Sequence, residues 1–205
     1  MNSTDIDIEL ARYSDWAFTS SVVVLVLALL LLAVELAYSR GRKVEARELV
    51  GVGADSATPG IVTTADTRTV DERIGRAGVA LTYVGIALLA ACIVLRGVAT
   101  SRVPWGNMYE FINLTCFSGL VAAAVVLRRP QYRGLWVFVL PPVLVLLTVS
   151  GKWLYTHAAP VMPALQSYWL PIHVSVVSLG SGVFLVGGVA SVLFLLKMSP
   201  LAQRD

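Results

Sequence analysis

The sequence predicts an all-α fold, a polytopic bundle of about five transmembrane helices that forms a single integral membrane domain over residues 1–205. Hydrophobic residues make up 57% of the chain, charged residues only 14%, and the mean hydropathy is +0.75. These values are typical of a membrane protein rather than a soluble domain. The charges are also segregated, with long stretches that carry none, and five apolar segments stand out: 17–38, 77–95, 111–127, 135–149 and 170–196.

The first and last segments are easily long enough for a bilayer core, which needs about 20 helical residues. Acidic residues precede 17–38, basic residues follow it, and it exceeds the roughly 7–15 apolar residues of a signal-peptide core. We therefore expect a permanent first helix with the N-terminus outside. The segments 111–127 and 135–149 are short, so they must borrow flanking residues such as Met108 or Ser150.

The expected orientation follows from Lys and Arg in the short loops. If the helices alternate, most of these residues fall on one side, which we assign to the cytoplasm: Arg40, Arg42, Lys43, Arg47, Arg73, Arg76, Arg128, Arg129, Arg133, Lys197 and Arg204. The C-terminus is then cytoplasmic, 39–76 is a mobile cytoplasmic loop, and 151–169 is an outer loop. The net charge of +3 follows from these topology signals and indicates no nucleic-acid partner; the lipid bilayer is the expected surrounding.

Cys92 and Cys116 fall in the second and third predicted helices, nearer their outer ends. No CxxC pair exists, so the sequence offers no dithiol redox motif, which argues against a thiol oxidase of the DsbB type. The two cysteines either pack as small apolar residues or join neighbouring helix ends by a disulfide.

His173 is the sharpest candidate for a binding residue. It follows Pro171, which can open a helix because the missing N–H would lack an intrahelical partner there. An imidazole at the mouth of a membrane helix is costly to leave unpaired, so it is either buried against a partner or holds a ligand. Val176, Val177 and Gly180 follow, and this small, apolar surface suits a flat macrocycle such as haem, whose iron accepts a neutral imidazole.

The outer side, with the loops 96–110 and 151–169, holds both histidines and most of the tryptophans. Trp and Tyr collect at headgroup depth without any ligand, so an aromatic belt and a ligand site are both open. His157 is available as a second axial ligand, or is simply solvated. Glu110, beside Tyr109 and close to Arg102, either forms an interfacial ion pair or takes part in the site. For Glu35, near the inner end of the first helix, we expect an ion pair with Arg40 or Arg42.

Other kinds of site have less support. Two histidines 16 residues apart, without nearby cysteines or clustered carboxylates, fall short of the three protein ligands of catalytic zinc. A b-type cytochrome anchor exchanging electrons with quinone would place histidines deep in the helices, whereas both lie near one surface here. A further alternative is that the protein is a structural membrane subunit without a cofactor.

Two segments resemble the CcsA/ResC family of cytochrome c assembly proteins, in its actinobacterial form. They are PWGNMYEF at 104–111 and the loop that ends in MPALQSYWLPIHV at 162–174, and SDWAF at 14–18 is similar to the same form. The resemblance implies handling of haem b together with a ResB-type membrane protein, in the cytoplasmic membrane of a bacterium. Haem is presented on the outer face for attachment to apocytochrome c, with a thioredoxin-like thiol reductant as a further partner.

In that family, two outward-facing histidines flank a WGxxWxWDxxE segment and ligate the haem iron. The upstream histidine maps onto His173, and no role passes to His157. Trp105, Trp153 and Trp169 are the expected local walls for the macrocycle. The sequence contains no WGxxWxWD segment, so it resembles about the N-terminal three-fifths of such a protein, and we expect it not to attach haem by itself.

Overall fold

The computed structural model describes the chain over 7–52, 70–101, 103–104, 106–157 and 167–199, without the side chains of 39–52 and 70–71. These residues form helices and their connections only: α1 (Ile8–Val52), α2 (Val70–Ala99), α3 (Met108–Val126), the 3-10 helix η1 (Pro130–Leu135), α4 (Trp136–Trp153) and α5 (Trp169–Met198). Five stretches of this helical chain are long and apolar enough to cross a membrane, which confirms the predicted number of spans. The protein is therefore a multi-pass membrane protein.

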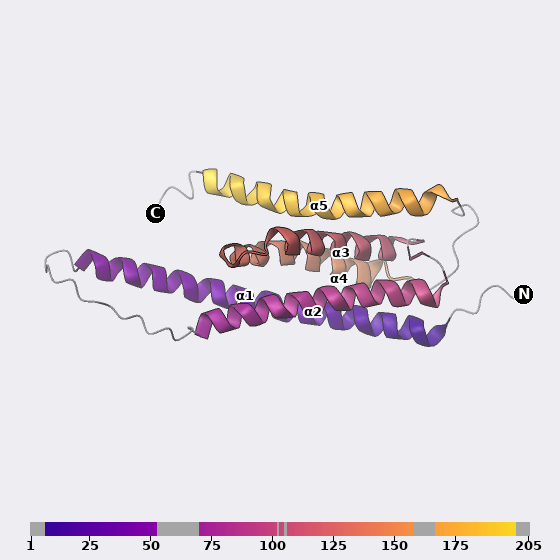
Figure 1. Ribbon diagram of the computed structural model, residues 1–205, viewed down its shortest axis with the longest axis horizontal. Helices are drawn as coiled ribbons and strands as arrows, with labels where there is room; N and C mark the ends of the chain where they lie inside the picture. Colours follow the sequence, from indigo (N-terminus) through magenta and orange to yellow (C-terminus); the bar gives the residue numbers. More distant parts are fainter. Residues whose placement is uncertain (1–6, 53–69, 102, 105, 158–166, 200–205) are drawn as a thin grey trace, which may run out of the picture.

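The helices lie side by side along one long axis (Figure 1). The longest contact is between α1 and α2, while α3 packs between α4 and α5. The core is formed by α1, α2, α3 and α4, whose fully buried side chains include Leu25, Leu89, Leu120 and Leu147. The outermost helix, α5, has only two fully buried residues, Ser178 and Gly182.

Two boundaries differ from those predicted. The first helix continues from the membrane span to Val52, and α2 begins at Val70, so much of the predicted 39–76 loop is helical; 53–69 lie outside the described residues. The reason is composition: Lys, Glu, Ala, Arg and Leu dominate 43–49, all of them favour helix, and the next proline is Pro59. The apolar segment predicted from the sequence ends at residue 38, whereas the helix continues to Val52.

Small residues let α1 approach α2 closely. A Cβ at Gly85 would lie 2.6 Å from Leu25, and one at Gly78 would lie 2.8 Å from Leu32. The Ser21 hydroxyl donates a 2.9 Å hydrogen bond to the Gly85 carbonyl across the same contact. Close packing between small residues is a main source of helix association in a bilayer, where apolar burial gives little.

A second glycine contact holds α5 against α3. A Cβ at Gly182 would lie 2.5 Å from the Gly119 nitrogen, and the Ser118 hydroxyl donates a 3.0 Å hydrogen bond to the Leu179 carbonyl. Ser178 and Gly182 are thus the small-residue pair of α5 that packs against a neighbour. By contrast, Gly187 and Gly188 have open space around them within the described chain.

Candidate functional site

A buried ion pair joins the end of α2 to the beginning of α3. Arg96 donates a 2.9 Å hydrogen bond from Nε to Oε1 of Glu110, and these residues are only 2% and 3% exposed. Arg96 also donates to the carbonyl of Thr156, just after α4. One guanidinium therefore ties three helix ends together, which suits an arginine because its donors fan out in a fixed plane.

The local sequence around α3 places Glu110 for this contact. Asn107 caps the helix, and its side chain accepts a 2.9 Å hydrogen bond from the Glu110 nitrogen. The second carboxylate oxygen of Glu110 accepts a 2.8 Å hydrogen bond from the Gly106 nitrogen. The sequence predicted an ion pair as one role for Glu110, and the structure supplies Arg96 as a partner; Arg102 lies outside the described residues.

Asp15 on α1 extends the network to a fourth element. Its Oδ1 lies 3.6 Å from a terminal nitrogen of Arg96, and its Oδ2 accepts a 2.6 Å hydrogen bond from the Tyr155 hydroxyl. Burial, followed by the hydrogen bond to Asp15 and its charge, raises the pKa of Tyr155 above the ordinary value. Tyr155 therefore acts as a neutral donor to a carboxylate that Arg96 also balances.

Aromatic rings cover the buried arginine. The Tyr109 ring lies 4.7 Å from the guanidinium carbon of Arg96, and Phe18 packs against Tyr109 at a centroid distance of 5.3 Å. Tyr155 meets Tyr109 edge to face at 5.5 Å, and His157 meets Tyr155 in the same way at 5.5 Å. Tyr109 is completely buried, so it is part of this core and does not belong to an aromatic belt at the membrane surface.

Both cysteines are free thiols and are buried. The Ser14 hydroxyl donates a 3.1 Å hydrogen bond to the Cys92 carbonyl, and the Cys92 sulfur lies 3.9 Å from the Tyr109 hydroxyl. Cys116 lies in the apolar core and reaches the Val143 carbonyl of α4 at 4.0 Å. Of the two alternatives from the sequence, the structure has the packed, unpaired cysteines.

His173 lies on α5, one turn after the helix begins at Trp169 and two residues after Pro171. Its side chain is exposed and, within the described chain, has no hydrogen bond, ion pair or ring contact. Trp169 is four residues earlier, hence on the same side of the helix, and is 71% exposed. A Cβ at Gly180 would meet nothing within 4 Å, so the surface beyond His173 is open.

The other predicted site residues are more dispersed. Trp153, at the end of α4, is 75% exposed, and His157 is exposed and contacts only the edge of Tyr155 within the described ranges. Trp105 lies outside the described residues. The structure thus brings Tyr109 and Glu110 to Arg96, leaves His157 at the edge of Tyr155, and places His173 with Trp169 on α5.

Sequence reasoning missed Arg96 and Asp15 as members of a site. Arg96 lies just after the predicted apolar segment 77–95, in the stretch expected to be an outer loop, but the structure places it inside α2. A signal existed: an ionisable residue within a membrane helix demands a partner, and Asp15 and Glu110 are two of the acidic residues on the same predicted side. Their pairing with one arginine depends on how α1, α2 and α3 pack.

Glu35 also differs from expectation, because it pairs with Arg133 of η1. The side chains of Arg40 and Arg42, the predicted partners, are not among those described. This contact ties α1, near the end of its apolar span at Tyr38, to the connection between α3 and α4.

Comparisons with known proteins point to one family. The chain is 30% identical over 122 residues to the cytochrome c biogenesis protein CcsA of Gloeobacter violaceus, covering 58% of this chain and 36% of that protein. It is 28% identical over 126 residues to CcsA of Cycas taitungensis, with 60% and 38% covered, and 29% identical over 122 residues to CcsA of Arabidopsis thaliana, with 58% and 36% covered.

No family model and no solved structure matches the chain. The matched part of the chain spans under two-fifths of the length of these curated relatives, at 36% to 38%. These relatives all carry the name CcsA. The same type of protein is the one that the motifs at 104–111 and 162–174 resemble, and the five apolar helices fit a membrane protein of that type. Over about three-fifths of its length, the chain is similar to cytochrome c biogenesis proteins of the CcsA type.

Proposed function

We propose that the protein handles haem in cytochrome c biogenesis and holds the haem iron through the imidazole of His173. The haem is a substrate, presented at the outer face of the membrane to apocytochrome c, and the protein works together with a ResB-type membrane protein. Similarity to CcsA proteins supports the biological process, because those proteins are named for cytochrome c biogenesis. The single observation that supports the site is the exposed His173 on an open face of α5.

The surface around His173 fits a large, flat, mostly apolar ligand. Trp169 and His173 lie one turn apart, and exposed Val176 and Val177 continue the surface toward Gly180. From Trp169 to Gly180 the helix rises about 16 Å, which is long enough to support one face of a macrocycle. A neutral imidazole is an ordinary axial ligand of haem iron, and an exposed Trp supplies an apolar wall.

The described residues divide the work between binding and support. His173 binds the iron and Trp169 covers one edge of the ring, while the pair of Arg96 and Glu110 fixes the neighbouring helix ends. Haem itself carries the vinyl groups that react with cysteine thiols, so the protein contributes position rather than bond-making chemistry. Trp153, Trp105 and His157 remain predicted neighbours of the haem.

The test is haem content after expression with a ResB-type partner. Purified wild type, His173→Ala and His157→Ala are compared by pyridine haemochrome absorbance per mole of chain. We expect His173→Ala to lose most of the haem and His157→Ala to keep it. Equal haem content in wild type and His173→Ala would exclude His173 as the ligand, and absence of haem from all three would contradict haem handling by this chain.

A further inference from the structure

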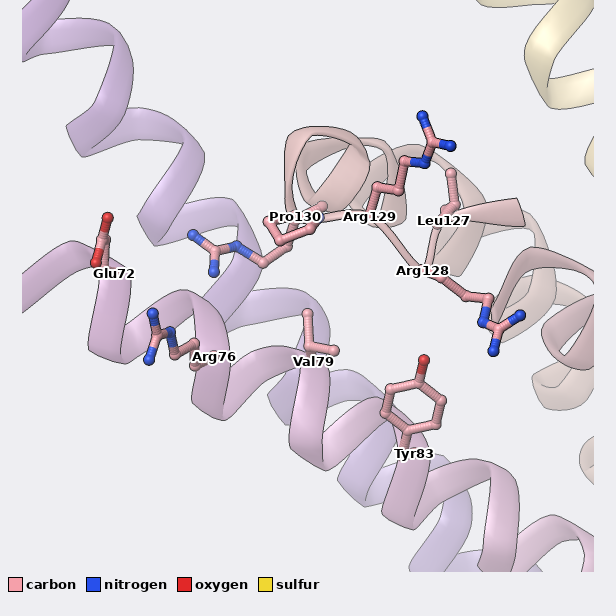
Figure 2. A pocket seen from close by; sticks show the side chains of 9 residues that line it. Glu72, Arg76, Val79, Tyr83, Leu127, Arg128, Arg129 and Pro130 are labelled. Atoms are coloured by element: carbon pink, nitrogen blue, oxygen red, sulfur yellow. The ribbon is translucent and has the colours of Figure 1, made fainter. Parts of the chain in front are cut away.

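A pocket lies between α2 and the segment that joins α3 to η1 (Figure 2). Its volume is about 410 Å³, within the usual range for small-ligand sites. On α2, the residues at spacing i, i+4, i+7 and i+11 line it: Glu72, Arg76, Val79 and Tyr83. Across from them lie Leu127, Arg128, Arg129, Pro130 and Arg133.

Positive charge exceeds negative charge in the pocket. Four arginines and one glutamate line it, and Arg133 is paired with Glu35. Within the described chain, Arg76, Arg128 and Arg129 take part in no ion pair, and all three are exposed. Figure 2 shows Glu72 beside Arg76, Arg128 at the Tyr83 side, and the Arg129 guanidinium turned away from α2. Arg128 is therefore the arginine placed to contact an anion together with the Tyr83 hydroxyl, while Arg76 adds positive charge at the other end of the pocket.

The shape of the cavity selects the kind of anion. Arg76 lies seven residues before Tyr83, so its charge is about 10 Å along α2 from the end of the pocket where Tyr83 and Arg128 lie. Val79 and Leu127 form its apolar floor, and the exposed residues 84 and 87, a valine and an alanine, continue along α2 toward the middle of the span. An amphiphile with a charged head and apolar tails matches this order, whereas a soluble anion would use only the arginines.

We propose that this pocket binds the phosphate headgroup of an anionic phospholipid. Guanidinium groups bind phosphate oxygens in a bidentate manner, and basic pockets between the ends of membrane helices hold acidic headgroups. In Figure 2 the Tyr83 hydroxyl points toward the 127–129 segment, where it can donate to the same phosphate. The acyl chains then lie along Val84 and Ala87. This site is at the end of the bundle opposite Arg96 and is independent of the proposed haem site.

The test compares a pocket variant with a variant that loses the same charge elsewhere. R76Q/R128Q removes two pocket charges; R73Q/K197Q removes two exposed charges that do not line the pocket. The full chain in detergent is titrated with phosphatidylglycerol, phosphatidylcholine and soluble glycerol phosphate, and lipid retention is read by native mass spectrometry. A thermal melt without lipid verifies that both variants fold.

We expect phosphatidylglycerol to bind wild type and R73Q/K197Q alike, and at least about tenfold more weakly to R76Q/R128Q. Phosphatidylcholine and glycerol phosphate should bind all forms weakly. Equal retention of phosphatidylglycerol by the two variants would overturn the proposal. Binding of glycerol phosphate as strong as that of the lipid would also overturn it, because the site would then take free phosphate.

Discussion

Arg96 Nε lies 2.9 Å from Glu110 Oε1, and this ion pair connects α2 to α3 inside the helix bundle. Both side chains are almost completely buried, and the aromatic rings around them exclude water from the pair. Charges in such a place are costly alone and acceptable together. The ion pair therefore helps to hold the ends of α1, α2, α3 and α4 together. Of these helices, α3 packs against α5.

Arg96→Met should destabilise the protein by about 3–5 kcal/mol, because it leaves Glu110 buried without its counter-charge. Lys152→Met is the matched control, since Lys152 is an exposed cation at the same end and should change stability by less than about 0.5 kcal/mol. Unfolding of the detergent-purified proteins by heat or denaturant measures both. Equal stability of the two variants would contradict a structural role for the pair.

Gly182→Ala should weaken the packing of α5 on α3, while Gly187→Ala should not. A Cβ at position 182 would lie 2.5 Å from the Gly119 nitrogen, and one at position 187 would meet nothing within 4 Å. Overpacking costs about 1–3 kcal/mol, whereas alanine is otherwise favoured over glycine in a helix. Gly182→Ala should therefore lower the melting temperature and Gly187→Ala should raise it. A downward shift for both variants or for neither would show that α5 does not pack against α3 through Gly182.

Tyr155 should lose its proton only at a pH above the usual tyrosine range near 10, because burial and Asp15 raise its pKa. Since the pKa is raised in the folded protein, the stabilisation is fully present below about pH 10 and is lost as the pH rises through the folded pKa. The difference in tyrosinate absorbance between wild type and Tyr155→Phe isolates this titration.

Asp15→Asn tests the contribution of the Asp15 charge to the pKa of Tyr155. The substitution keeps an oxygen that can accept the Tyr155 hydrogen bond and removes the negative charge. The pKa of Tyr155 should then move down toward the ordinary value. An unchanged titration curve in Asp15→Asn would mean that Asp15 does not contribute to the shift.

The orientation of the bundle, with the N-terminus outside, stays a prediction from the basic residues of the loops. Lys152→Cys and Arg73→Cys place an exposed thiol at opposite ends, while Cys92 and Cys116 are buried. In intact cells, a membrane-impermeant maleimide should label Lys152→Cys, and it should label Arg73→Cys only after lysis. The reverse pattern would invert the topology and place His173 on the cytoplasmic side.

Much of the fold was predictable from the sequence because bilayer thickness fixes the length of each apolar segment. We expected the third membrane helix to extend beyond its apolar segment to include Met108, and α3 does begin at Met108. The end of α1 was not predicted, since a polar helix outside the membrane carries no apolar period. The position of His173 near the start of α5 followed from Pro171 and the apolar run after it.

The buried site was less predictable, because its members come from four separate helices and their ends. Tyr109 looked like an interfacial aromatic residue, but Phe18 of α1 and Tyr155 after α4 enclose it. Similarly, the partner of Glu35 is Arg133, which is 98 residues away in the chain. Local pattern identifies charged and aromatic residues at a helix mouth, but tertiary packing decides which of them meet.

The most direct test of haem ligation is chemical rescue of His173→Gly. The variant is purified with its ResB-type partner and reconstituted with haem, and the Soret band is recorded with and without added imidazole. We predict that the substitution abolishes the wild-type Soret position and that imidazole restores it, because the free base replaces the missing side chain at the iron. A wild-type Soret band in His173→Gly without imidazole would show that another residue ligates the haem and would contradict the assignment of His173.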